Sequence, residues 1–238
     1  MRLYIMQLGI NPAAGSPYPG YLIQVGNGTS VLVDTGFGPK MVELSRQPGH
    51  QGARITEDDL VVNQLARIDV RPDDITHLIA THFDGDHAGS LTAFPRAEIV
   101  VQRRHYEVAK AGHPRFAGTR EQWDDPRLRY RLVDGDTTLV PGVELIETSG
   151  HVPGHQSVLV RLPQTGPVLL AIDAIARALG DHTPETRPTG PYDLDETETR
   201  ASTRKLVDLA AREGVTLIVY GHDPEEWKKL RKAPQFYA

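Results

Sequence analysis

The chain has 238 residues, which is long enough for one large α/β domain with a sizeable core, so we expect a single domain over residues 1–238. Hydrophobic residues make up 39% of the chain and charged residues 24%, without a long biased tract, which excludes a wholly disordered or collagen-like protein. The net charge of -5 and the scattered positive charges predict neither a nucleic-acid partner nor binding to a membrane surface.

The chain contains no cysteine, which excludes disulfides, iron–sulfur clusters and thiol nucleophiles. Its first ten residues lack the apolar core and the small-residue cleavage site of a signal peptide. No apolar run approaches the ~18 residues that a membrane span needs. We therefore expect a cytoplasmic protein.

Short β runs alternate with helices along the chain. In the first half we expect strands at 22–25, 30–33, 77–80 and 98–102, and helices at 56–68 and 103–111. In the second half we expect strands at 143–148, 157–162, 168–172 and 215–220, a long helix at 195–213, and a short helix that begins at Asp223-Pro224. Residues 178–194 have no periodicity and predict a long loop, which is often functional. The pattern indicates an α/β protein.

The strongest chemical signal is the segment Thr81-His-Phe-Asp-Gly-Asp-His-Ala-Gly89, which directly follows a buried β run. Four potential metal ligands stand there within six residues: His82, Asp84, Asp86 and His87. Imidazole suits Zn, Fe, Ni and Cu, and carboxylate also suits Mn and Mg. Three further candidates, His151, Asp173 and His222, each come just after a hydrophobic β run, where α/β folds place their sites.

Seven ligands are enough for two metal ions about 3.5–4 Å apart. In this hypothesis metal one is bound by His82, Asp84 and His151. Metal two is bound by Asp86, His87 and His222, and Asp173 bridges the two ions.

This order of ligands resembles the metallo-β-lactamase superfamily. Asp34-Thr-Gly and Ser149-Gly-His-Val-Pro-Gly-His155 match it too, so that the resemblance covers essentially the whole chain. It implies an αβ/βα four-layer sandwich with the site at one edge and with two divalent metal ions, zinc above all. A hydroxide between the ions would attack the substrate carbonyl, with Asp86 and Asp173 as catalytic residues: Asp86 would pass a proton to the leaving alkoxide and Asp173 would hold both ions.

Within the superfamily the chain is most similar to the N-acyl-homoserine lactonase-like branch. This closer resemblance depends on Phe94-Pro-Arg-Ala-Glu-Ile-Val-Val-Gln-Arg, on Asp173-Ala and on Tyr220-Gly-His-Asp-Pro-Glu-Glu-Trp. It implies a quorum-quenching hydrolase that opens an acyl-homoserine lactone or a related small-molecule lactone or ester.

Two positions depart from the family pattern. Asp84 stands where the superfamily usually has a second histidine, and the harder carboxylate favours Mn or Fe over Zn. Ala176 stands where lactonases of this branch often carry a tyrosine, and Tyr192 in the long loop is a candidate substitute.

Other functions stay open at this point. The same metals would serve a thioesterase, arylesterase, phosphotriesterase or β-lactamase, and a non-catalytic metal-binding module is a further alternative. With Asp84, the first metal motif also resembles the His-x-Glu-x-Asp-His pattern of flavodiiron oxidoreductases. This resemblance predicts a di-iron redox protein, although the chain has no room for a flavodoxin domain.

The remaining candidates concern the pocket and the surface. We expect apolar lining from Phe37, Met41, Phe116, Trp123 and Tyr192, and Met41 is also a candidate for a homodimer surface. Asp34 is expected to bond to backbone or to the metal loop, and His155 to support the ligands. We expect solvated or loop positions for His50, His105, His113 and His182.

Overall fold

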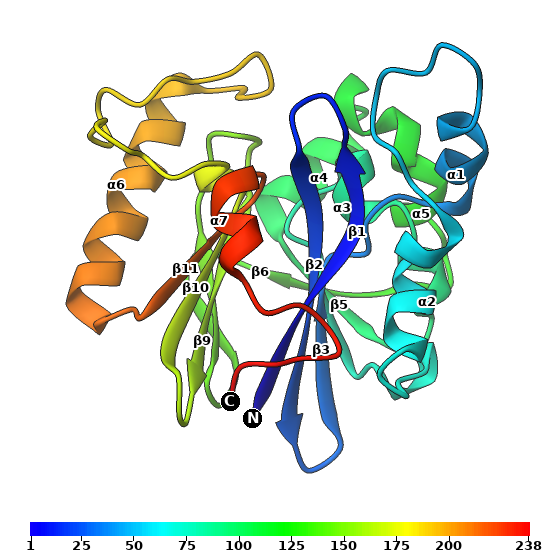
Figure 1. Cartoon of the computed structure of the whole chain (residues 1–238), viewed down its shortest axis with the longest axis horizontal. Coiled ribbons are helices and arrows are strands. Elements are labelled where there is room, and N and C mark those ends of the chain that lie inside the picture. The colour runs from blue at the N-terminus through cyan, green and yellow to red at the C-terminus, as the bar shows by residue number, and fades with distance from the viewer.

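The computed structural model describes all 238 residues and contains two β-sheets packed face to face (Figure 1). The first sheet has the order β1-β2-β3-β4-β5-β6 and the second the order β11-β10-β9-β8-β7. The strands are β1 (Arg2–Asn11), β2 (Ser16–Gly26), β3 (Thr29–Val33), β4 (His77–Ile79), β5 (Glu98–Gln102), β6 (Arg129–Val133), β7 (Thr137–Val140), β8 (Val143–Glu147), β9 (Gln156–Leu162), β10 (Gly166–Ile172) and β11 (Leu217–Tyr220).

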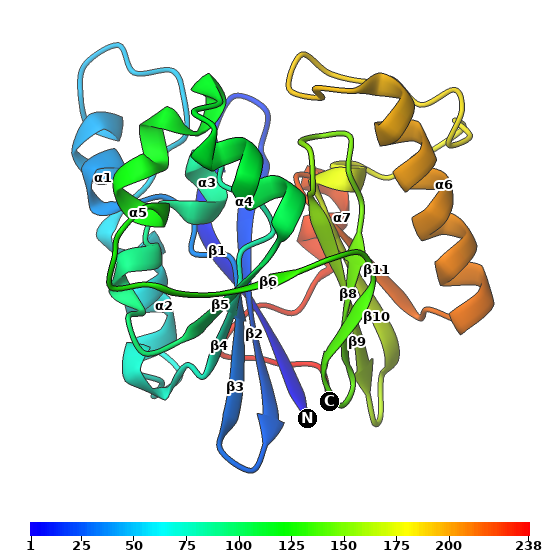
Figure 2. The same cartoon turned by 180° about the vertical axis from the view of Figure 1, so that it is seen from behind.

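Helices cover the outer face of each sheet, which the front and back views both show (Figures 1 and 2). The helices of the chain are α1 (Pro39–Ser45), α2 (Val61–Ala66), α3 (Gly85–Ala88), α4 (Arg103–Lys110), α5 (Arg120–Trp123), α6 (Glu196–Glu213) and α7 (Pro224–Lys229). Helix α7 is not on an outer face: it contacts β2 and β11 and adds Trp227 to the core between the sheets. Helix α6 lies alone outside the second sheet, whereas α1 to α5 lie on the side of the first. None of the helices has the length and apolar character that crossing a membrane requires.

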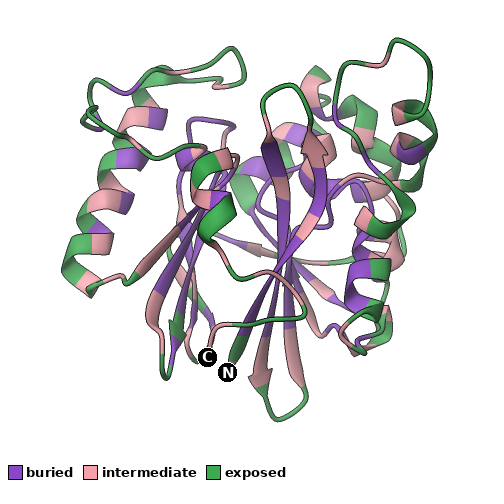
Figure 3. Cartoon of the chain, in the orientation of Figure 1, coloured by how far each residue is buried: buried purple, intermediate pink, exposed green.

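The period-two alternation of strand side chains produces this layering. In β1, Leu3 and Ile5 join the core between the sheets, together with residues of β8, β9 and β10. Tyr4, Met6 and Leu8 point the other way and pack with α2 and the loops outside the first sheet. Buried residues are accordingly concentrated in the two sheets (Figure 3).

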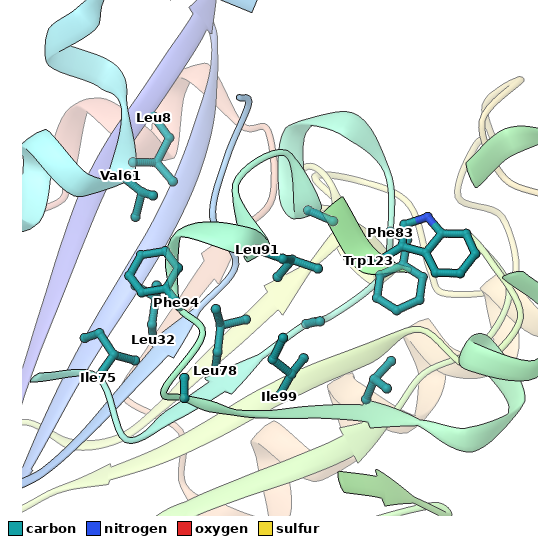
Figure 4. Packing of buried hydrophobic residues seen from close by; sticks show 14 of the residues in the cluster. Leu8, Leu32, Val61, Ile75, Leu78, Phe83, Leu91, Phe94, Ile99 and Trp123 are labelled. Carbon is teal, nitrogen blue, oxygen red and sulfur yellow. The ribbon is translucent and has the colours of Figure 1, made fainter. Parts of the chain in front are cut away.

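The outer cores complete the sandwich. Outside the first sheet, Leu78 and Ile99 pack beneath Leu91 and Phe94 (Figure 4). Outside the second sheet, Leu206 and Leu209 of α6 pack against Leu159 and Leu169. The order helix, sheet, sheet, helix is the predicted αβ/βα four-layer sandwich.

The observed elements differ from the prediction in several places. The sequence analysis did not predict β1, β6 and β7 as strands. β1 is apolar on both faces and so lacks an alternating pattern, and β6 is an edge strand with exposed arginines. The expected helix 56–68 is a short 3₁₀ turn at Glu57–Asp59 followed by α2, because the extended backbone at Leu60 separates them.

Both ends of α6 and the start of α7 agree with the prediction. Asp195 caps α6 by accepting a hydrogen bond from Glu198 N (2.8 Å), and Gly214 ends it in the left-handed region at φ 62°. Asp223 caps α7 ahead of Pro224.

Candidate metal centre

All seven candidate ligands meet at one edge of the sandwich. The segments that follow β4, β8, β10 and β11 carry them, Asp86 and His87 within α3, so that strands distant in sequence supply one site. The ligand atoms of His82, Asp84 and His151 lie within 4.8 Å of one another. Those of Asp86, His87 and His222 form a second group within the same limit.

Asp173 lies between these two groups. Its Oδ2 is 3.3 Å from His151 Nε2 and 3.5 Å from His87 Nε2, whereas its Oδ1 is 3.1 Å from His222 Nε2. One carboxylate therefore faces histidines of both groups, as a residue that bridges two ions must.

Unpaired polar atoms support a metal at this position. His82 Nε2, His87 Nε2 and Asp173 Oδ1 are buried without a hydrogen-bond partner. Buried polar atoms without partners are costly and rare in native proteins. A divalent cation would satisfy all three, and the nitrogen and oxygen donor set suits Zn, Fe or Mn. The residues present thus fit a metal pair.

The carboxylates also change the pKa values of the histidines around them. Burial alone would lower the pKa of His151, but Asp173 and Asp193 outweigh it and raise the value to about 9. For His222 burial is likewise outweighed by Asp173, and the pKa rises to about 8. A metal ion must displace the protons that these rings would hold at neutral pH, so metal binding weakens as the pH falls.

The nitrogens that point away from the centre are held by neighbours. Asp34 accepts hydrogen bonds from Thr81 N (2.9 Å) and Thr81 Oγ1 (2.7 Å) and pairs with His87 Nδ1 (2.8 Å), as predicted for its contact with the metal loop. His222 Nδ1 donates to the carbonyl of Pro17 (2.8 Å). These contacts aim the Nε2 atom of each ring at the centre.

The backbone is strained immediately before Asp173. Ile172 is β-branched and has a φ of 52°, in the left-handed region that such residues rarely adopt. Strain of this kind persists only where the surroundings enforce it, and it concentrates at functional sites. Here it turns the chain at the end of β10 and precedes the carboxylate that lies between the two ligand groups.

The prediction for His105 was wrong. Its side chain is fully buried, and its Nε2 accepts a hydrogen bond from Phe83 N (2.9 Å) while Nδ1 donates to Pro153 O (2.9 Å). Burial lowers the pKa of His105 to about 3, so the ring is neutral. It ties the loop of His82 to the loop of His151. The helical position of His105 near a polar surface did not reveal this role.

Replacing His105 by alanine is expected to lower the free energy of unfolding by about 2–4 kcal/mol at pH 8, through the cavity and the unpaired Phe83 amide. The contribution of the neutral ring is complete above the unfolded pKa of ~6.5 and is lost as the pH falls towards 3. The difference between wild type and His105→Ala should therefore shrink by up to about 1.4 kcal/mol per pH unit below about pH 6.

Urea unfolding of the metal-free proteins between pH 5 and 8 measures this difference. His182→Ala removes an exposed histidine and should stay within about 0.5 kcal/mol of wild type. A difference for His105→Ala that does not change with pH would contradict the neutral-ring assignment.

Sequence reasoning missed Arg115. Its Nε donates to Asp84 Oδ1 (2.8 Å) and its Nη2 to Asp84 Oδ2, while Nη2 also lies 2.9 Å from His151 Nε2. Burial raises the pKa of Asp84, but the guanidinium outweighs it and holds that pKa well below its usual range. The extra carboxylate in the motif was the available signal, because a buried charge needs a partner.

A cavity of about 790 Å³ opens onto the ligands. Phe37 and Tyr192 line it as predicted, but Met41, Phe116 and Trp123 do not. Phe116 and Trp123 belong to the buried core beneath, where the Trp123 ring stacks on Phe83 at 5.2 Å. Met41 packs instead with the small core cluster around Val42 and Ile55.

Tyr18 of β2 is a second lining residue that the sequence analysis missed. Its ring lies 5.4 Å from the ring of His222 and 5.0 Å from that of Phe37. Tyr192, the predicted substitute for the tyrosine absent at Ala176, is 72% exposed. Tyr18 is therefore the lining tyrosine that packs on a candidate ligand.

Comparison with known proteins assigns the family. The family model of the metallo-beta-lactamase superfamily matches residues 17–222. The chain belongs to the metallo-beta-lactamase superfamily. The N-acyl homoserine lactonase AiiA of Bacillus thuringiensis subsp. kurstaki is 34% identical to this member over 227 residues, which cover 91% of this chain and 85% of the relative.

Further relatives of this superfamily member extend over its whole length. The N-acyl homoserine lactonase AttM of Azorhizobium caulinodans is 35% identical over 272 aligned positions, covering 100% of this chain and 98% of the relative. A structure of an N-acyl homoserine lactone hydrolase with the product N-hexanoyl-L-homoserine at its catalytic metal centre has a TM-score of 0.86 and 30% identity, covering 99% of this chain and 98% of the other. The resemblance inferred from the sequence is confirmed.

Proposed function

We propose that the protein is a metal-dependent lactonase that opens the ring of an N-acyl-homoserine lactone or a related lactone. The observation that carries this proposal is the convergence of seven candidate nitrogen and oxygen ligands on one centre, five of which line a cavity of about 790 Å³. The lactonases that resemble the chain over nearly its full length support the substrate class.

The proposed ligands of the two ions are the groups that the geometry brings together. His82, Asp84 and His151 would hold one ion, Asp86, His87 and His222 the other, and Asp173 both. Two divalent ions there supply Lewis acidity and a hydroxide near neutral pH. We propose zinc as the metal, with iron or manganese as alternatives because Asp84 is a harder ligand than histidine.

Asp86 is the residue that we propose for proton transfer. It lines the cavity, and its Oδ2 lies 3.4 Å from His87 Nε2 and 3.7 Å from His222 Nε2. A carboxylate that borders both the ligand set and the substrate space can pass a proton to the leaving alkoxide. Water then adds across the ring C–O bond, and because the alkoxide stays tethered, the product is one hydroxy acid.

Arg115 is a positioning residue in this scheme. Its donors are engaged by Asp84 and by the Tyr192 carbonyl, so that it holds Asp84 and joins the long loop to the site. A cytoplasmic location and a homodimer stay predictions.

Acid release from a lactone panel, with and without prior chelation, tests the function. The panel holds short- and long-chain acyl-homoserine lactones and plain γ- and δ-lactones. We expect turnover that chelation abolishes and that added Zn²⁺ or Mn²⁺ restores. Metal-loaded protein that opens none of these rings would overturn the lactonase proposal and would favour another ester, thioester or phosphoester substrate.

A further inference from the structure

The cavity that opens onto the candidate ligands is also lined by a buried arginine that forms no salt bridge. Arg187 belongs to the loop between β10 and α6, lines the cavity and is only 7% exposed. Its Nη1 donates to Ala174 O (2.5 Å) and to Thr203 Oγ1 (2.7 Å). Its Nε and Nη2 make no hydrogen bond within the chain, and no carboxylate lies within 4.0 Å. A buried guanidinium stays charged and is costly unless an anion pairs with it.

A second unpaired arginine lines the same cavity. Arg177 donates from Nη2 to Ser16 Oγ (3.1 Å) and, like Arg187, has no salt bridge. The third lining arginine, Arg115, is already paired with Asp84. Asp193, the lining carboxylate of the same loop, is paired with His151 at 3.2 Å. The negative charge of Asp193 acts on Arg187 from beyond salt-bridge distance, and Arg177 is exposed to solvent, so that neither guanidinium has a carboxylate in direct contact.

Arg187 is held in a way that suits a ligand rather than mere packing. Two acceptors fix Nη1, which orients the planar group and leaves the Nε and Nη2 edge as a pair of parallel donors. This edge matches the two oxygens of a carboxylate. An alkyl acyl chain offers nothing that would compensate either guanidinium.

We propose that Arg187 and Arg177 form a carboxylate subsite, and that the preferred substrates are lactones that carry a carboxylate in addition to the ring ester. This inference rests on the proposed lactonase function and deepens it. The carboxylate can stand on the lactone ring or at the end of an acyl chain, and the experiment separates these two sources.

The test uses two pairs of lactones, and the two members of each pair differ only in charge. One pair is 5-oxotetrahydrofuran-2-carboxylate and its carboxamide. The other is N-adipoyl-homoserine lactone with a free terminal carboxylate and the same compound with a terminal carboxamide. If the Arg187 guanidinium binds the substrate carboxylate, wild type should prefer the carboxylate over the carboxamide by about 10- to 100-fold in kcat/KM for at least one of the two lactone pairs.

Arg187→Gln should reduce this preference to less than about threefold, and Arg177→Ala should reduce it partly, because Arg177 is exposed. The preference is a ratio within one protein, so a general loss of activity or stability cancels. Arg212→Ala, which removes an arginine at the far end of α6, should retain the wild-type preference.

The outcomes separate the two proposals. Equal rates for carboxylate and carboxamide in both pairs, with clear lactone turnover, would overturn the subsite and leave the lactonase standing. If no lactone is opened, the function fails, and calorimetric binding of the carboxylate lactones to zinc-loaded protein decides the subsite. Tighter binding by wild type than by Arg187→Gln would support it, and equal or absent binding would overturn it.

Discussion

Replacing Asp173 by asparagine is expected to lower kcat/KM for lactone hydrolysis by at least about 10³-fold and to release at least one metal ion. The carboxylate faces His222 at 3.1 Å through one oxygen and His151 at 3.3 Å through the other. An amide keeps the shape but loses the negative charge and one acceptor. The two ions would then have no shared anionic ligand at position 173.

Metal content after exhaustive dialysis and steady-state kinetics measure this effect together. Asp223→Asn is the matched control, because Asp223 is also a buried carboxylate that follows a strand end, yet it caps α7. This control should retain its metal and its activity. An Asp173→Asn protein with two tightly bound ions and normal turnover would show that Asp173 does not hold them.

Changing Asp84 to histidine, the residue usual in the superfamily, is expected to weaken zinc binding by about 10- to 100-fold as long as Arg115 remains. The change leaves the Arg115 guanidinium without its carboxylate and close to His151 Nε2, at 2.9 Å. Two unit charges about 4 Å apart interact by about 4 kcal/mol at an effective dielectric of about 20. Solvent at the partly exposed guanidinium screens some of this repulsion.

Adding Arg115→Leu to Asp84→His should raise the zinc affinity at least tenfold above that of Asp84→His alone, although the second substitution removes the contact of Arg115 with the Tyr192 carbonyl. Competition with a chromophoric chelator measures the affinity of each protein without relying on activity. Arg120→Leu, which removes an exposed arginine from α5, serves as the control in the Asp84→His background. Equal zinc affinity of the single and the double variant would mean that Asp84 and Arg115 act independently.

The seven candidate ligands could be predicted because each follows a hydrophobic β run, and because parallel strand ends share one edge of a sheet. Asp84 directly precedes the short helix α3 and His87 lies in it, and His151 and His222 follow strands of the second sheet. The local motif and the positions of the strand ends were therefore enough to predict which side chains meet at the site. Their roles as ligands stay a prediction until the metal-loaded protein is examined.

The contacts that hold these ligands could not be predicted in the same way. Arg115 is 31 positions from Asp84 and reaches it only because the 3₁₀ helix after α4 folds back over the site. His105 is a core residue because it bridges two loops that are distant in sequence. Such pairings depend on tertiary packing, which neither helix periodicity nor motif spacing specifies.

The residues that line the cavity could likewise be predicted only in part. Phe116 and Trp123 are aromatic residues in a segment that borders the site, yet they pack beneath it in the outer core. Arg187 lies in a loop without any periodic pattern, and only its burial beside the cavity distinguishes it from a surface arginine. The aromatic residues and Met41 suggested an apolar cavity, whereas the folded chain also places charged residues in its lining.

The most direct test of the account is anomalous X-ray diffraction from crystals of the metal-loaded protein, recorded on both sides of the metal absorption edge. We expect two peaks about 3.5–4 Å apart, one beside His82, Asp84 and His151 and the other beside Asp86, His87 and His222, with Asp173 between them. A single peak, or two peaks away from Asp173, would contradict the proposed dinuclear centre.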